Sequence, residues 1–181
     1  MEVVIVYESL FGRARQAAEA VAAGVREAAP RAHVVVLRVT EANLIRASQA
    51  DLLVVGGPTH GLGLSTPSSR RKALRGAARP GGQAEPGADG PGIREWLTQL
   101  PRGARAGQAA AFDTRCASGL PGAAGAIARR LRQRGFRVVL SPRPFIVDGP
   151  HGPLAPGEKE RARAWGAACY YALGLTTSLT H

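Results

Sequence analysis

The chain has few cysteines and no long apolar run, and both absences narrow the classes of protein it can belong to. Its only cysteines are Cys116 and Cys169, too few and too scattered for a disulfide framework or a zinc site. No apolar run approaches the ~20 residues that a membrane-spanning helix needs. No charged-then-apolar leader precedes the first strand-like residues. These observations predict a soluble, cytoplasmic protein.

Aromatic residues and lysines are also scarce, although the chain is strongly basic. Aromatic residues make up 5% of the chain, and the formal net charge is +11. Only two of the 24 basic residues are lysine, and the arginines are spread along the whole chain instead of filling one stripe. So few aromatics leave little surface on which nucleic-acid bases would stack. Nucleic-acid binding is therefore disfavoured, whereas a positive field would attract anionic ligands or acidic protein partners.

Side chains typical of hydrolytic or metal-dependent chemistry do not cluster in the sequence. The four histidines have no spacing that suggests a metal pair; they are His33, His60, His151 and His181. The serines at positions 65, 68 and 69 lack the glycine context of a nucleophile elbow. The sequence therefore gives little support to a hydrolase or a metal centre.

What the sequence does contain is a regular alternation of strand-like and helix-like segments. Apolar, β-branched runs predict strands over residues 3–7, 33–39, 51–56 and 108–112, and a fifth strand in two parts, 136–140 and 144–147. Helical patterns cover residues 15–29, 41–48, 68–74, 93–100, 122–134 and 158–173, with Thr40 as the expected cap of the second helix and Gly174 as the end of the last. This alternation predicts an α/β fold with a doubly wound parallel sheet and helices on both faces, in three α/β/α layers.

The length fits one domain, and one segment within it has no regular pattern. A chain of 181 residues can bury a full core without disulfide or metal cross-links, so residues 1–181 are predicted to form a single domain. Glycine and proline dominate residues 76–92, which predicts an exposed, flexible loop. The loop is not a domain boundary, because the alternation of strands and helices continues after it.

The loop after the first predicted strand has the features of a phosphate-binding turn. A short buried strand, a glycine turn and a helix start follow one another there, with the sequence Ser9-Leu10-Phe11-Gly12-Arg13-Ala14. The N–H groups of the turn and of the first helical turn point at one place, where the helix dipole favours an anion. That place lies at the carboxyl end of the strand, where an open α/β sheet binds its ligand. A glycine at a helix start is also common without any ligand, so this alternative stays open.

Two further loops join the first at the same edge of the sheet, and together they resemble known proteins. The sequence Gly56-Gly57-Pro58-Thr59-His60-Gly61 follows the third strand, and Ala111-Phe112-Asp113-Thr114-Arg115 covers the end of the fourth. The three loops resemble those of the flavodoxin-like family, which comprises flavodoxins and flavodoxin-like quinone reductases. The resemblance implies a five-stranded parallel sheet in the order 2-1-3-4-5 and non-covalent binding of FMN in these loops.

In the first loop, the resemblance implies a phosphate site that keeps part of the family's pattern. The family pattern has hydroxyl residues at the first, third and sixth positions and glycine at the fourth. Ser9 and Gly12 retain the pattern, whereas Phe11 and Ala14 replace two hydroxyl residues. The N–H groups from Leu10 to Ala14 and the cation of Arg13 remain as partners for a phosphate. Each lost hydrogen bond costs roughly 0.5–1.5 kcal/mol, so FMN binding is weakened and not abolished.

In the second and third loops, the resemblance implies contacts to the flavin ring. No tryptophan or tyrosine stands where flavodoxins usually stack one, so His60 is the best candidate for a ring face. The expected hydrogen bonds to the ring edge and ribityl chain come from Thr59, Gly61 and the backbone around Asp113, Thr114, Arg115 and Cys116. Pro58, in the same turn as Thr59, is also an expected cofactor-binding residue. Other roles stay open for some of them, since Asp113 and Thr114 could instead cap the following turn and Thr59 could stabilise its own loop.

These observations favour an FMN-binding redox protein over two alternatives. The protein would exchange electrons with a redox partner protein, or act as an FMN-dependent oxidoreductase that reduces a small acceptor such as a quinone. The first alternative is a flavin-free module of the same fold that binds another anionic ligand or a protein, which the missing hydroxyls and aromatics favour. The second is a basic surface protein that meets nucleic acid or acidic partners. The oligomeric state is left open by the sequence.

Overall fold

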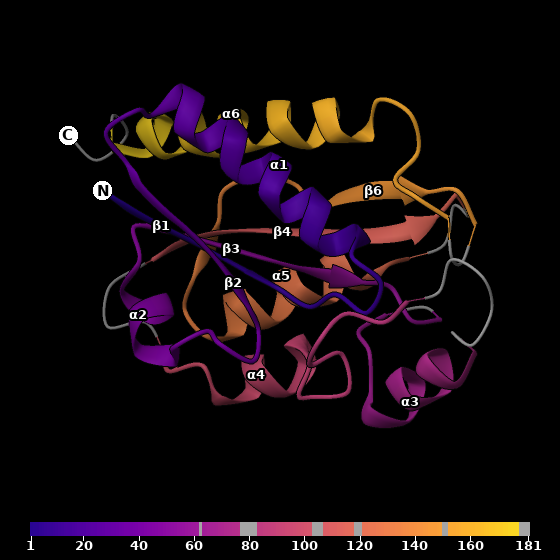
Figure 1. The fold of residues 1–181 in the computed structure, drawn as a ribbon. Coiled ribbons are helices and arrows are strands. Elements are labelled where there is room, and N and C mark those ends of the chain that lie inside the picture. Colours follow the sequence, from indigo (N-terminus) through magenta and orange to yellow (C-terminus); the bar gives the residue numbers. More distant parts are fainter. Residues whose placement is uncertain (62, 77–82, 103–106, 118–120, 150–151, 178–181) are drawn as a thin grey trace.

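A computed structural model describes residues 1–61, 63–76, 83–102, 107–117, 121–149 and 152–177, the last four of these by their backbone alone. In chain order the elements are β1 (Glu2–Tyr7), α1 (Arg13–Ala28), β2 (His33–Arg38), α2 (Leu44–Gln49), β3 (Leu52–Pro58), α3 (Pro67–Gly76), α4 (Ile93–Gln99), β4 (Gln108–Cys116), α5 (Ala123–Gln133), β5 (Arg137–Val138), β6 (Arg143–Val147) and α6 (Glu158–Thr177). Figure 1 shows their arrangement around one sheet. No helix within the described part of the chain is long and apolar enough to cross a membrane.

The sheet confirms the predicted fold class and strand order. Its strands are parallel and follow the order β2-β1-β3-β4-β5, with β6 also paired to β4. The fifth predicted strand is present as the two pieces β5 and β6, which pair with successive parts of β4. Ser141 and Pro142 lie between the two pieces, where the sequence placed the interruption. The carboxyl ends of the strands all lie at one edge of the sheet.

Helices cover both faces of the sheet, and alternate residues of each central strand point to opposite faces. Val3 and Ile5 of β1 belong to a core beneath α1 and α6, whereas Val4 and Val6 belong to a core beneath α2, α4 and α5. The apolar runs of the central strands therefore carry no polar face, as expected for a parallel sheet that is buried on both sides. The short helix α3 lies apart from both layers, at the carboxyl edge of the sheet (Figure 1).

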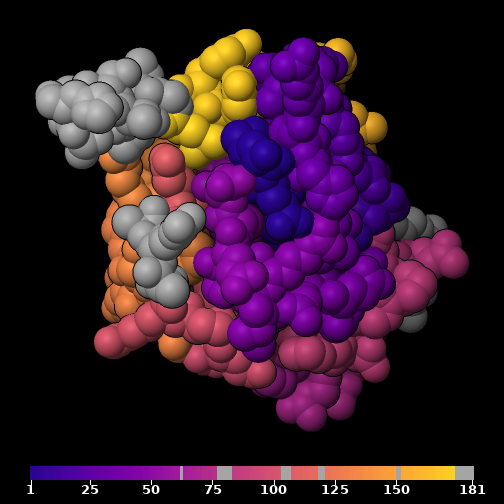
Figure 2. Space-filling view, turned by 90° about the vertical axis from the view of Figure 1, so that its left-hand side faces the viewer, coloured from indigo at the N-terminus to yellow at the C-terminus, as the bar shows by residue number. Residues whose placement is uncertain are grey.

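Helices α1 and α6 touch through their backbones at two glycines. A Cβ atom placed on Gly24 of α1 would lie 1.8 Å from the carbonyl oxygen of Arg163, and one placed on Gly166 of α6 would lie 2.1 Å from that of Val21. Only glycine leaves room for so close an approach. Figure 2 shows the side of the molecule on which the strands begin, with the N-terminal residues beside α6. A shallow hollow on this side is lined by Met1, Ala28 and Tyr170, among other residues.

Several predicted helix ends were wrong, including that of α3, which was predicted to end at residue 74 and ends at Gly76. Helix α1 begins at Arg13, two residues before the predicted start, because Gly12 directly precedes the first helical residue as its cap. Helix α2 begins at Leu44, and the side chain of Asn43 caps it by accepting a hydrogen bond from Arg46 N at 3.0 Å, so Thr40 is not the cap. Helix α6 continues through Gly174 to Thr177.

The segment predicted as a flexible loop, residues 76–92, is described only in part. Gly76 ends α3, and residues 77–82 lie outside the described part of the chain. From Glu85 onward the segment contacts the rest of the fold, since Glu85 N donates to Leu10 O at 2.8 Å and Ala88 and Gly92 are buried. The flexibility of this segment stays a prediction, and so does the single domain over residues 1–181.

Candidate functional site

A cavity lies at the carboxyl edge of the sheet, where the three predicted loops meet. Its volume is about 630 Å³. It is lined by Ser9, Leu10, Phe11, Arg13, Ala14, Pro58, Thr59, His60, Gly61, Ser69, Lys72, Ala73, Gly76, Thr114, Arg115, Cys116, Val147 and Gly152. Among these residues Arg13, Lys72 and Arg115 are basic and none is acidic. The cavity is therefore suited to an anionic ligand.

The first loop forms a tight turn into α1 because of the conformation of Gly12. Gly12 has φ +86° and ψ −9°, in the left-handed region that favours glycine. Its N–H donates to the hydroxyl of Ser9 at 3.0 Å, and its carbonyl accepts the first backbone bond of the helix, from Gln16 N at 2.9 Å. The N–H groups of Ala14 and Arg15 precede that bond, so they have no partner inside the helix. The turn thus presents the amino end of α1 to the cavity wall.

Arg13 lies along the same wall and is held by the loop itself. Its Nε donates to Gly152 O at 2.7 Å, and its Nη1 donates to Phe11 O. The guanidinium carbon lies 5.9 Å from the centre of the Phe11 ring, within the range of a cation–π contact. Burial lowers the pKa of Arg13, the nearby Glu85 opposes that shift, and an arginine remains protonated at neutral pH. The loop therefore positions a fixed positive charge beside the amino end of α1.

A cluster of polar side chains, the Glu85 cluster, holds the first loop. It consists of Glu85, Arg15, Arg38 and Ser9, of which only Ser9 lines the cavity. The Glu85 carboxylate accepts from Arg15 Nε at 2.5 Å and from Arg38 Nη2 at 2.9 Å, and it also bonds to the Ser9 hydroxyl. Arg38 Nη1 donates to Ser9 O at 3.1 Å. Burial opposes ionisation of Glu85, but the bonds from Arg15, Ser9 and Arg38 together outweigh it and lower its pKa.

The second and third loops are tied to the start of α5. The Thr59 hydroxyl accepts from Ala123 N at 2.9 Å, and the Asp113 carboxylate accepts from Ala124 N at 2.8 Å. Thr59 N also donates to Thr114 O at 2.9 Å. Burial raises the pKa of Asp113, while the bond from Ala124, the charge of Arg115 and the bond from Thr59 act against the increase. Asp113 therefore caps α5 instead of lining the cavity.

His60 lies at the edge of the cavity and contacts α3. Its Nδ1 lies 3.0 Å from the hydroxyl of Ser69, and its backbone forms a narrow turn with Gly63. Burial lowers the pKa of His60, and the positive charge of Arg70 lowers it further. Both effects favour the neutral ring, which lies where the sequence placed a contact to a flavin ring.

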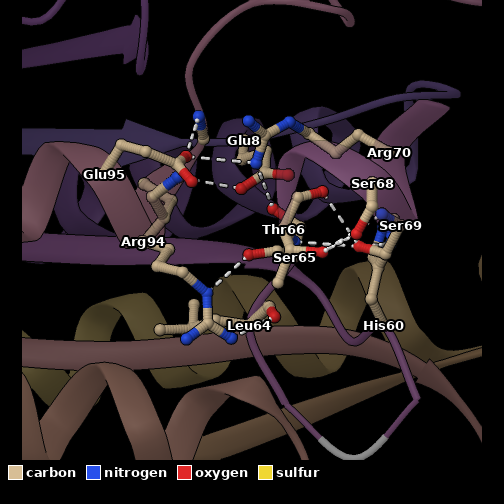
Figure 3. A network of polar contacts seen from close by, with 12 residues as sticks. Glu8, His60, Leu64, Ser65, Thr66, Ser68, Ser69, Arg70, Arg94 and Glu95 are labelled. Carbon is tan, nitrogen blue, oxygen red and sulfur yellow. Dashed lines mark hydrogen bonds and ion pairs between the residues drawn. The ribbon is translucent and has the colours of Figure 1, made fainter.

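A buried network of polar side chains joins the end of β1 to α3 and α4 (Figure 3). Glu8, only 4% exposed, accepts from Ile93 N at 2.8 Å and bonds to the Ser65 hydroxyl. Arg70, only 3% exposed, donates to Ser65 Oγ at 2.9 Å and lies 3.1 Å from a carboxylate oxygen of Glu95. Burial raises the pKa of Glu8, against the bonds from Ser65 and Ile93 and the charge of Arg70. The network fixes α3 beside the first loop.

Most of the residues that the sequence placed in the site line the cavity, and two do not. Gly12 shapes the turn, and Asp113 caps α5. The sequence did not indicate the contributions of Ser69, Lys72, Ala73 and Gly76, which lie on one side of α3, nor those of Val147 and Gly152. Val147 is the last residue of its strand, so the rule that ligands bind at carboxyl ends could have indicated it. No comparable signal pointed to Gly152.

Comparison with known proteins supports the fold at low sequence identity. No family model matches the chain, and no curated protein sequence matches it. Among solved structures, a flavodoxin from the domain Archaea has a TM-score of 0.65 at 19% identity, over 96% of this chain and 99% of its own. Flavodoxin 1 from Bacillus cereus has a TM-score of 0.62 at 18% identity, over 94% and 98%. The rubredoxin oxygen:oxidoreductase from Desulfovibrio gigas has a TM-score of 0.61 at 18% identity, over 99% of this chain and 37% of its own. The chain thus has the flavodoxin-like fold.

Proposed function

We propose that the protein binds FMN in the cavity at the carboxyl edge of the sheet and serves as a redox protein. The observation that carries this proposal is the cavity itself, which brings the three loops together beside the amino end of α1 and has basic but no acidic side chains in its lining. Similarity to flavodoxins supports it through the shared fold. The electrons would pass to a partner protein or to a small acceptor such as a quinone.

The phosphate end of FMN fits the first loop. The left-handed turn at Gly12 directs the first N–H groups of α1 toward one place, and Arg13 adds a full positive charge there. The Ser9 hydroxyl is already bonded to Gly12 N and to Glu85, so the backbone and Arg13 would carry most of the binding. Glu85, Arg15 and Arg38 hold the loop in this shape from outside the cavity.

The ring end of FMN fits the walls formed by the second and third loops and α3. Pro58, the neutral His60 ring and Val147 provide flat or apolar surface, and Lys72 and Arg115 provide positive charge. Bound FMN would supply the electron chemistry, and the residues of the chain would orient it and adjust its electronics through nearby charge. The Thr59 and Asp113 bonds to α5 keep the two loops in place.

A second candidate function is a flavin-free module that binds another anionic ligand. It is favoured by the first loop, where Phe11 and Ala14 carry no hydroxyl and the Ser9 hydroxyl is used within the protein. A loop without available hydroxyl groups gives up part of the hydrogen bonding that a phosphate monoester could receive. The basic cavity lining remains suited to an anion in either case.

Titration with FMN and with riboflavin separates the two candidates. We expect purified protein to quench FMN fluorescence on binding and to take on a yellow colour. Arg13→Gln should weaken FMN binding roughly tenfold to a hundredfold, since a charge-assisted hydrogen bond contributes roughly 1.5–3 kcal/mol. It should leave riboflavin, which lacks the phosphate, almost unaffected. Arg26→Gln, in the last turn of the same helix, is the matched control. A colourless protein with no quenching in excess FMN would favour the second candidate.

A further inference from the structure

The outward side of α3 carries an unbalanced positive charge next to the cavity. Arg71, Lys72 and Arg75 are exposed, and none of them forms an ion pair within the described part of the chain. Together with Ser68 they line a shallow surface hollow of about 380 Å³. The sequence contains no Asp or Glu between Asp51 and Glu85, so no acidic side chain from this part of the chain neutralises the helix.

The inward side of α3 fixes the helix so that these cations face solvent. Arg70 is buried and bonded to Ser65 and Glu95, and Ser69 contacts His60 (Figure 3). The carboxylates of Glu8 and Glu95 interact with Arg70 on the inner side of the helix. These contacts hold the helix, and with it the face that carries the exposed charges, in one orientation, so the helix need not be ordered when an opposite charge binds.

Lys72 belongs both to the cavity lining and to the shallow hollow. The basic surface on α3 therefore begins at the rim of the cavity, where a molecule that exchanges electrons with a bound cofactor must approach. The sequence has no Phe, Tyr or Trp between Phe11 and Trp96, so α3 and its flanking segments offer no stacking platform for bases. These features fit an acidic protein surface better than a nucleic acid.

We infer that the outer side of α3, comprising Ser68, Arg71, Lys72 and Arg75, is the docking surface for an acidic protein partner. Its role in electron transfer depends on the proposed function, whereas the docking itself does not. Positive charge at the rim attracts an acidic partner and orients it toward the cavity. Binding should therefore weaken with rising ionic strength, because exposed charges are screened over about 10 Å at 0.1 M salt.

The experiment measures direct binding of two protein probes of opposite charge. A [2Fe–2S] ferredoxin of net negative charge should bind in low salt, and a cytochrome c of net positive charge should not. The test variant is Arg71→Gln/Arg75→Gln, which leaves the cavity residue Lys72 in place. The matched control is Arg129→Gln/Arg132→Gln, which removes the same charge from exposed positions toward the far end of α5.

We expect the α3 variant to weaken ferredoxin binding about fivefold in low salt, because it loses two exposed ion pairs of modest strength. The salt dependence of binding should decrease as well. The control should change the affinity less than twofold. Equal losses in both variants would overturn the inference, because binding would then reflect net charge alone. Binding of duplex DNA that is tighter than that of ferredoxin and lost in the α3 variant would overturn it in favour of a nucleic-acid surface.

An FMN titration of the same proteins keeps this inference separate from the proposed function. Both variants should bind FMN as the unsubstituted protein does, since none of the four substituted residues lines the cavity. Ferredoxin binding that depends on α3 in a protein that takes up no FMN would refute the redox function and retain the docking surface. FMN uptake together with ferredoxin binding that is unchanged in the α3 variant would refute the docking surface and retain the redox function.

Discussion

Glu85 is the side chain whose removal tests most directly how the first loop is held. In Glu85→Ala, Arg15 and Arg38 lose their shared carboxylate and the Ser9 hydroxyl loses one partner. The pair with Arg38 is largely buried, with side chains 12% and 11% exposed, whereas Arg15 is 41% exposed. A buried charge-assisted bond contributes roughly 1.5–3 kcal/mol and an exposed ion pair about 0.2–1 kcal/mol. We therefore expect the free energy of unfolding to fall by about 2 kcal/mol.

Thermal unfolding and FMN titration are the assays for this prediction. For a chain of this length, a loss of about 2 kcal/mol lowers Tm by roughly 4–8 °C. The control is Glu19→Ala, which removes the other carboxylate on Arg15 at a position where the glutamate is 53% exposed. It should change the free energy of unfolding by less than about 0.5 kcal/mol. Equal Tm values for the two variants would refute the reasoning that the Glu85 cluster stabilises the loop.

The pH dependence of the same variant provides a second test. Because the pKa of Glu85 is lowered in the folded protein, its contribution to stability is present above the unfolded value of about 4.3 and is lost as the pH falls through the folded value. The difference in stability between the unsubstituted protein and Glu85→Ala should therefore be constant near pH 7 and should shrink below about pH 4. A difference that grows in acid would contradict the assignment of an ionised carboxylate.

Three further predictions concern other positions. Gly12→Val should abolish FMN uptake while the protein remains folded by circular dichroism, because φ +86° is strained for a β-branched residue; unchanged affinity would show that the loop is not the site. Glu8→Gln should gain stability relative to the unsubstituted protein as the pH rises from about 4 to 7, because the raised pKa in the folded protein means that ionisation of Glu8 costs stability over that range. Denaturant titrations at both ends of the pH range measure the difference in the free energy of unfolding between the two proteins. A difference that stays constant would argue against the raised pKa. In the native protein a thiol reagent should label the half-buried Cys116, whereas Cys169, whose pKa burial raises to about 12, should react only after unfolding. Excess FMN should slow the labelling of Cys116, which lines the cavity, and an unchanged labelling rate would place the ligand elsewhere.

The strands and their order were predictable because their signal is local and strong. The runs in β1 and β3 are continuously apolar, as strands buried on both faces require, and the structure buries every residue from Val3 to Val6 completely. The break at Ser141 and Pro142 was also visible, since proline cannot donate to a strand ladder. Strand order came from the resemblance, because local patterns do not say which strands are neighbours.

The helix ends were less predictable, because equivalent local signals compete there. Thr40 and Asn43 are both suitable caps, and only the backbone path of this loop selects Asn43. Gly174 is a common helix end, but α6 continues past it. Packing of α6 along α1 can offset the roughly 1 kcal/mol that a glycine costs inside a helix.

The site was predictable in its location and less so in its contacts. The loops at the carboxyl ends of parallel strands converge in any sheet of this kind, so most of the cavity lining followed from topology. The Glu85 cluster could not be predicted, because Glu85 lies in a glycine- and proline-rich segment without periodicity, and its partner Arg38 comes from the end of β2. Contacts between segments so far apart in sequence depend on the complete fold.

The glycine contact between α1 and α6 has a consequence for how the chain can be shortened. The first loop is continuous with α1, and α1 lies directly on α6 at Gly24 and Gly166, so the end of the chain helps to hold its beginning. Deleting α6 would expose the side of α1 that contacts it at Gly24 and remove support from the anion-binding turn at the tip of α1. A fragment that ends before Glu158 should accordingly lose ligand affinity together with cooperative unfolding, even though every loop at the cavity remains in it.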